Sequence, residues 1–130
     1  MSATDVLKFI KDKEAEFVDL RFTDPRGKLQ HLTMDATVVD EDMLKDGVFF
    51  DGSSIAGWKA INESDMILKP DTSRFFLDPF TSHNTAVLFC DILDAVKKTP
   101  YERDPRGVAK KAEEYLKASG IGDKAFFGPE

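Results

Sequence analysis

Alternating apolar and polar positions predict the first two strands of this chain. In residues 17–23 every second side chain is apolar (Val18, Leu20 and Phe22), as in a strand with one buried face. The Asp-Pro-Arg-Gly sequence at 24–27 is typical of a tight turn. We therefore expect residues 28–34 to return beside the first strand and complete a hairpin.

Shorter apolar runs predict the rest of a sheet. Three further strands are expected at 48–50, 66–69 and 73–78. Pro70 should end the second of these, because proline has no N–H group for the ladder. Residues 85–93 form the longest apolar run and are predicted to be a central strand. Residues 124–130 (K-A-F-F-G-P-E) are expected to begin a buried strand.

Three segments carry the signals of helices. Ser2 can cap a first helix, whose apolar residues recur at helical spacing (Ala3, Val6, Leu7 and Ile10). Residues 40–45 place acids before a lysine, and Gly47 suits the end of a short helix there. A third helix is predicted over 105–119, with Asp104 as its cap and one apolar stripe along it (Val108, Ala112, Tyr115 and Leu116).

The stretch from 49 to 66 (F-F-D-G-S-S-I-A-G-W-K-A-I-N-E-S-D-M) is predicted to be a loop held by apolar anchors. Its anchors recur every three residues and are expected to point into the core (Ile55, Trp58 and Ile61). The other side is then a polar edge (Asp51, Ser53, Ser54, Lys59, Glu63 and Asp65). Loops on a rigid scaffold often carry function.

Composition narrows the class of protein. A chain of 130 residues with 42% hydrophobic content can form one compact domain plus an appendage. The net charge of -6 is spread along the chain, which argues against nucleic acid or a membrane as partner and would attract a small cation. The single Cys90 permits no internal disulfide, and no apolar stretch could form a signal peptide or a span. We therefore expect a cytoplasmic protein.

The predicted elements describe a small α+β domain. A hairpin, helices and further strands within the first hundred residues indicate a mixed sheet compatible with a β-grasp (ubiquitin-like) fold. We place this domain at 1–100. Residues 101–130 are then a connecting helix and the first strand of a catalytic domain that the chain does not contain.

Several strings resemble those of one family, the bacterial type I glutamine synthetases, in their amino-terminal domain. The string F-D-G-S-S-I-A-G-W-K-A-I-N-E-S-D-M carries most of the resemblance. F-V-D-L-R-F-T-D precedes it, and D-P-F, C-D-I, Y-x-R-D-P-R and F-F-G-P-E follow it in the same order. The likeness extends over the whole chain.

This resemblance implies a function and a site. In that family, ATP phosphorylates the side-chain carboxylate of glutamate, and ammonia then displaces phosphate to give glutamine. The enzyme is a ring-shaped homo-dodecamer, and the small domain lends its D-G-S-S loop to the catalytic domain of the neighbouring subunit. By resemblance, Asp51 would bind ammonium and help remove its proton, Ser54 would line the same site, Asp65 would lie near the flap, and Glu130 would bind one of two Mg²⁺ or Mn²⁺ ions.

Alternatives remain at each level. The D-G-S-S string could be only a turn whose hydroxyls satisfy the backbone. Asp104 is expected to start a helix, and His31 and His83 lack the spacing of metal ligands. The chain as a whole could be a free-standing β-grasp module that binds a synthetase ring or a regulator. We favour a fragment of a synthetase, because residues 124–130 would otherwise be half of a buried strand, and we expect this chain alone to be inactive.

Overall fold

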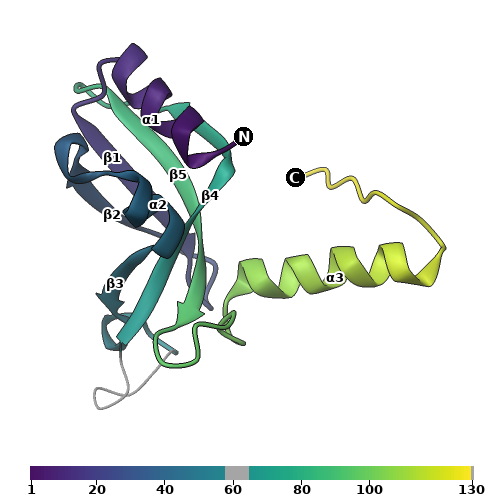
Figure 1. Cartoon of the computed structure of the whole chain (residues 1–130). Helices are drawn as coiled ribbons and strands as arrows, with labels where there is room; N and C mark the ends of the chain where they lie inside the picture. Colours follow the sequence, from purple (N-terminus) through teal and green to yellow (C-terminus); the bar gives the residue numbers. More distant parts are fainter. Residues whose placement is uncertain (58–64, 130) are drawn as a thin grey trace.

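A five-stranded mixed sheet with two helices on one face forms the body of the protein (Figure 1). The computed structural model describes residues 1–57 and 65–129. The strands are β1 (Phe17–Thr23), β2 (Leu29–Asp35), β3 (Val48–Asp51), β4 (Asp65–Leu77) and β5 (Thr85–Asp94). The helices are α1 (Ala3–Asp12), α2 (Glu41–Asp46) and α3 (Pro105–Ser119), with short 3₁₀ turns η1 (Ala36–Val38) and η2 (Gly52–Ser54). The predicted β-grasp class is confirmed.

The order of the strands places three strand ends at one edge of the sheet. The order is β2-β1-β5-β4-β3, so β5 is central, as predicted from its apolar run. β1 runs parallel to β5, whereas β4 runs antiparallel to both β3 and β5. The carboxyl ends of β1, β3 and β5 therefore lie at the same edge. The loops that follow these three strands gather there.

The core lies between the sheet and the two helices α1 and α2. Strands β1 and β5 contribute side chains that are buried on alternate positions (Val18, Leu20, Phe22, Ala86, Leu88, Cys90 and Ile92). Helix α1 adds Val6 and Ile10, and α2 adds Leu44. Burial of apolar surface of this kind is the main favourable contribution to folding. The predicted inward face of the first strand is confirmed.

Local signals set the ends of the helices. The Ser2 hydroxyl accepts a hydrogen bond from the backbone N–H of Asp5, and the Asp5 carboxylate accepts one from the backbone of Ser2, which makes a capping box. Asp40 caps α2 in a similar way, and Gly47 ends it with a positive φ of 86°. A side chain at Gly47 would collide with Ile67 and with the backbone of Leu68.

Two predictions about strands are wrong. β4 continues through Pro70, which lies opposite Cys90, and joins the two strands expected at 66–69 and 73–78. The register shifts between Pro70 and Phe75, and this irregularity accommodates the residue that lacks an N–H donor. At the other end of the chain, residues 124–129 form no strand, and Phe126 and Phe127 are 86% and 91% exposed.

Helix α3 projects away from the sheet (Figure 1). Asp104 caps it and Gly120 ends it, as predicted, and Lys117 and Glu113 form the expected ion pair at 3.1 Å. Two residues of the predicted apolar stripe, Val108 and Tyr115, are exposed, whereas Leu116 is half-buried and lies beside Gly122. Helix α3 touches the sheet mainly through its first turns, on the face opposite α1 and α2. The proposed division of the chain near residue 100 stays a prediction.

Candidate functional site

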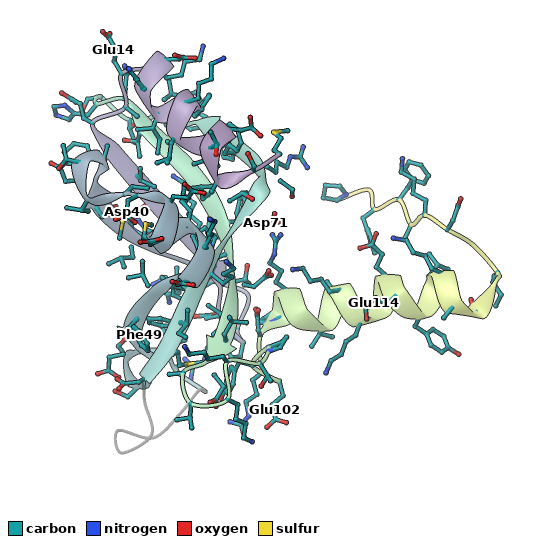
Figure 2. The ribbon with its side chains drawn as sticks, in the orientation of Figure 1. Glu14, Asp40, Phe49, Asp71, Glu102 and Glu114 are labelled. Carbon is teal, nitrogen blue, oxygen red and sulfur yellow. The ribbon has the colours of Figure 1, made fainter. Side chains whose placement is uncertain are left out.

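The edge where β1, β3 and β5 end is the candidate site. The β1–β2 turn, the loop after β3 and the segment before α3 all lie at this edge. Figure 2 shows Phe49 on β3 and Glu102 ahead of α3 toward the same end of the molecule. Segments that are far apart in the sequence are thus brought together by the sheet.

Asp51 ends β3 and begins the turn η2. Its Oδ1 atom accepts a hydrogen bond from the backbone N–H of Ser53 at 2.9 Å and another from the Ser53 hydroxyl at 2.6 Å. The Ser54 hydroxyl donates to the backbone carbonyl of Asp51 at 2.7 Å. A purely structural turn would make the same bonds. They also fix the direction of the Asp51 carboxylate.

Buried neighbours hold this turn against the core. Gly52 and Ile55 are buried, whereas Asp51 and Ser54 are exposed. The prediction that Ile55 anchors the loop is confirmed. Trp58 and Ile61, the two other predicted anchors, lie outside the described residues, as does Glu130. A rigid base therefore presents two polar residues to solvent.

Asp65 lies directly opposite Asp51 in the antiparallel ladder of β3 and β4. Residues that face each other across such a ladder point to the same side of the sheet. Both carboxylates are exposed. The structure thus brings together Asp51, Ser54 and Asp65, three of the four predicted site residues, at one end of two paired strands.

A complete metal site is not found among residues 1–57 and 65–129. No group of three or more His, Cys, Asp or Glu side chains in these ranges is arranged to hold a metal ion. Glu130, the predicted ligand, lies outside the described residues, so metal binding stays a prediction.

Arg103 supports the loop from a second direction and was not singled out from the sequence. Its Nη1 atom donates to the backbone carbonyl of Gly57 at 3.0 Å. Gly57 has a φ of 88°, and a Cβ there would touch the ring of Pro25 at 3.7 Å. Arg103 stands in the string Y-x-R-D-P-R, which contributes to the family resemblance and predicts the start of a helix, but neither assigns a role to Arg103 itself.

A polar network covers the outer face of β1 and β2. Asp19 is 4% exposed and accepts hydrogen bonds from Arg21 Nε at 2.7 Å and from the Thr33 hydroxyl at 2.8 Å, and it lies 2.8 Å from His31 Nδ1. Arg21 also donates to Asp78 at 2.5 Å. Burial alone would raise the pKa of Asp19, but the hydrogen bonds from Arg21, His31 and Thr33 hold it below its usual value.

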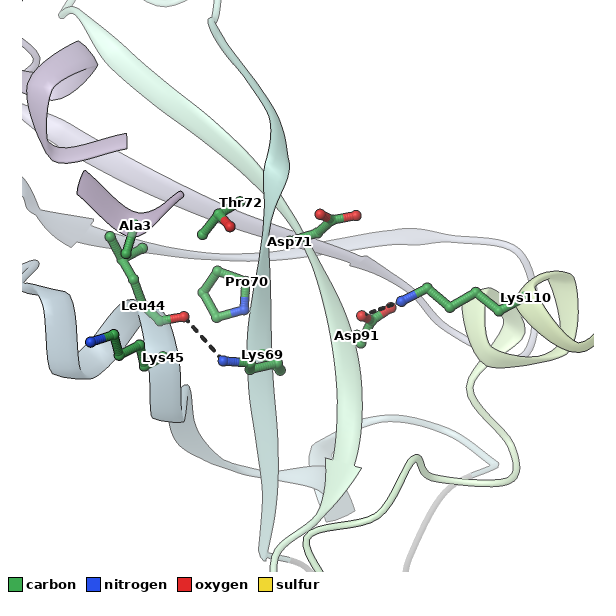
Figure 3. Close-up of a pocket in the computed structure, with 9 residues that line it drawn as sticks. All are labelled: Ala3, Leu44, Lys45, Lys69, Pro70, Asp71, Thr72, Asp91 and Lys110. Carbon is green, nitrogen blue, oxygen red and sulfur yellow. Dashed lines mark hydrogen bonds and ion pairs between the residues drawn. The ribbon is translucent and has the colours of Figure 1, made fainter. Parts of the chain in front are cut away.

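A pocket of about 310 Å³ lies beside the middle of β4 (Figure 3). Its charged side chains already have partners. Lys69 donates to the carbonyl of Leu44 at 3.3 Å, and Lys110 contacts Asp91 at 2.5 Å. Arg106 bridges Asp91 and Asp71, so these groups fasten the start of α3 to the sheet.

The fold and the acidic loop at its edge define a β-grasp domain that presents a carboxylate-bearing turn. Residues 14–95 match the family described as "Glutamine synthetase, beta-Grasp domain". The chain therefore belongs to the glutamine synthetase family, of which it carries the amino-terminal domain. Within the described part of the chain, no helix is long and apolar enough to cross a membrane.

Individual relatives agree with this assignment. The chain is 67% identical over 129 residues to the glutamine synthetase of Rhizobium meliloti, and 60% identical to that of Azorhizobium caulinodans. The matched region covers 99% of this chain but only 28% of the length of each relative. A Plasmodium falciparum glutamine synthetase superposes with a TM-score of 0.81 at 27% identity, covering 92% of this chain and 23% of that one.

Proposed function

We propose that this chain is the amino-terminal part of a glutamine synthetase and supplies the Asp51 loop to the active site of a neighbouring subunit. One observation carries the proposal: Asp51 is exposed at the end of a strand, on a turn whose own hydrogen bonds fix its carboxylate. The names of the relatives and their identity to this chain support it. Asp51 and Ser54 are then the residues that contact ammonium.

The proposed chemistry needs a carboxylate at this place. ATP transfers its terminal phosphoryl group to the side-chain carboxylate of glutamate, which gives a γ-glutamyl phosphate. Ammonium has no free electron pair, so it must lose a proton before its nitrogen can attack that carbonyl. Asp51 attracts the cation and accepts the proton, the C–N bond forms, and phosphate leaves with the electrons of the C–O bond.

The rest of the site comes from outside this chain. The relatives are more than three times as long as this chain. The part that this chain does not cover would therefore bind ATP and glutamate and supply most of the metal ligands. Glu130 as one ligand to Mg²⁺ or Mn²⁺ belongs to this proposal. A ring of twelve subunits in the cytoplasm is the proposed setting, in which a loop at a subunit boundary can serve the next subunit.

A chimera tests the proposal. This chain replaces the aligned segment of the Rhizobium meliloti glutamine synthetase, and glutamine formation is measured with ATP and ammonium. We expect activity in the chimera, a loss on the order of 100-fold in kcat with Asp51→Ala, as for removal of a general base, and little change in melting temperature. The 130-residue chain alone, as a control, should be inactive.

Three results would count against the proposal. An assembled ring with no activity would favour the alternative of a binding module. An Asp51→Ala chimera that is as active as the unsubstituted one, or one that fails to fold, would favour the interpretation of the D-G-S-S string as a structural turn only.

A further inference from the structure

We propose that Arg103 is a positioning residue for the Asp51 loop, and that it ties the geometry of this loop to the start of α3. The inference rests on the proposed function for its catalytic consequence. Its structural basis is the hydrogen bond from Arg103 Nη1 to the carbonyl of Gly57 at 3.0 Å. This contact joins segments 46 residues apart in the sequence.

The backbone on which Arg103 stands is held on both sides. The N–H of Tyr101 donates to the carbonyl of Ile92 at 2.9 Å, and the N–H of Ile92 donates to the Asp104 carboxylate at 3.0 Å. The N–H of Asp104 donates to the carbonyl of Tyr101 at 3.1 Å. Arg103 therefore projects from a short segment that is closed onto the central strand β5.

Different contacts hold the two ends of the segment from Asp51 to Gly57. Its beginning is fixed by the ladder of β3 and β4 and by the burial of Ile55. Two residues later, the Gly57 carbonyl accepts the hydrogen bond from Arg103, and the ring of Pro25 lies where a Cβ on Gly57 would touch it. Arg103 thus limits how far the segment between Ile55 and Gly57 can move away from the edge of the sheet.

The position of this contact determines what its loss would do. Arg103 and Gly57 are both exposed, so water can replace the guanidinium at the Gly57 carbonyl. Loss of an exposed hydrogen bond therefore changes global stability little. It releases a local motion instead, and local motions of a catalytic loop alter substrate binding and turnover.

Hydrogen exchange on this chain tests the contact directly. In Arg103→Ala, the amides of Ser53 and Ile55 should exchange about fivefold faster, as expected for the loss of one net hydrogen bond. Arg74→Ala is the matched control, since it removes an exposed arginine of β4 and the same charge. Unchanged exchange in Arg103→Ala, or the same acceleration in Arg74→Ala, would overturn the inference.

Kinetics of the chimera test the catalytic consequence. Arg103→Ala should raise the KM for ammonium several-fold and leave the KM for glutamate within about twofold, because only the ammonium subsite is positioned by this loop. Arg103→Lys keeps the charge and one donor and should restore part of the loss. Equal changes in both KM values would overturn a role at the ammonium subsite.

The two experiments separate the inference from the function on which it rests. If the unsubstituted chimera is inactive, the proposed function is wrong and the catalytic role of Arg103 is wrong with it. The exchange of Ser53 and Ile55 still decides, independently of activity, whether Arg103 holds the loop.

Discussion

Asp51 and Asp65 face each other at the last paired position of β3 and β4, so the candidate site begins with two carboxylates on one side of a sheet. Like charges directly opposite each other in an antiparallel pair are destabilising. A bound cation would relieve that repulsion. The pair of carboxylates therefore lies at a position where the proposed substrate carries a positive charge.

Removing one of these charges should stabilise the chain. We expect Asp65→Asn to raise the free energy of unfolding by about 0.2–1 kcal/mol, the range for a cross-strand charged pair. The gain should shrink at high salt, because screening weakens the repulsion between exposed charges. Urea denaturation at low and high ionic strength measures it, with Asp123→Asn as a surface control. A gain that does not depend on salt would contradict the electrostatic explanation.

The junction between the sheet and α3 should be sensitive to Asp104. This residue is 2% exposed, and its carboxylate accepts hydrogen bonds from the N–H groups of Ile92 at 3.0 Å and Arg106 at 3.1 Å. Asp104→Ala removes the helix cap and leaves the N–H of Ile92 without its acceptor. We expect a loss of about 2–3 kcal/mol in chemical denaturation, from the cap and the unsatisfied donor together. A loss below about 0.5 kcal/mol would contradict this role.

Asp104 should also contribute an unusual pH dependence. Burial raises the pKa of its carboxyl above the usual value, despite the two backbone hydrogen bonds. The folded chain then binds more protons than the unfolded chain between the unfolded pKa of about 3.9 and the raised one. The contribution of Asp104 to stability therefore falls as pH rises through that window.

Asp19 should show the opposite sign. Its pKa in the folded chain lies below the unfolded value, so the unfolded chain binds more protons and stability is lost as pH falls through the folded pKa. Asp19→Asn should cost about 1–3 kcal/mol at pH 7, because Arg21 and Thr33 lose a charged acceptor. The cost should shrink below about pH 4. Urea denaturation from pH 3 to 7 measures it, and a cost that is independent of pH would contradict the assignment.

Much of the fold follows from local signals in the sequence. The hairpin, the capped helices and the central strand were predicted because alternation, caps and turn residues act over a few positions. The prediction that a strand ends at Pro70 was wrong, because a register shift between Pro70 and Phe75 lets β4 continue. This shift depends on pairing with β5, which the local sequence does not reveal. The strand expected at 124–130 was inferred from its apolar residues, and two of these, Phe126 and Phe127, are exposed.

The candidate site, like the fold, was predicted from the sequence only in part. Asp51, Ser54 and Asp65 were identified by resemblance, and only the pairing of β3 with β4 shows that the two carboxylates are opposite each other. Arg103 could not be found from spacing, since its contact with Gly57 crosses 46 positions. The burial of Asp19 could not be predicted either, because the alternation of the strand places it on a polar face, and such a face is often exposed to solvent.

The most direct test of the central claim is complementation between subunits. Two inactive chimeras would be mixed, unfolded and reassembled: one carries Asp51→Ala, and the other has an intact loop but a disabled nucleotide site in its remaining domain. If the loop serves the neighbouring subunit, random assembly in a ring restores about a quarter of the activity, because each site draws its two parts from different chains. If the loop serves its own subunit, every site keeps one defective part and the mixture stays inactive.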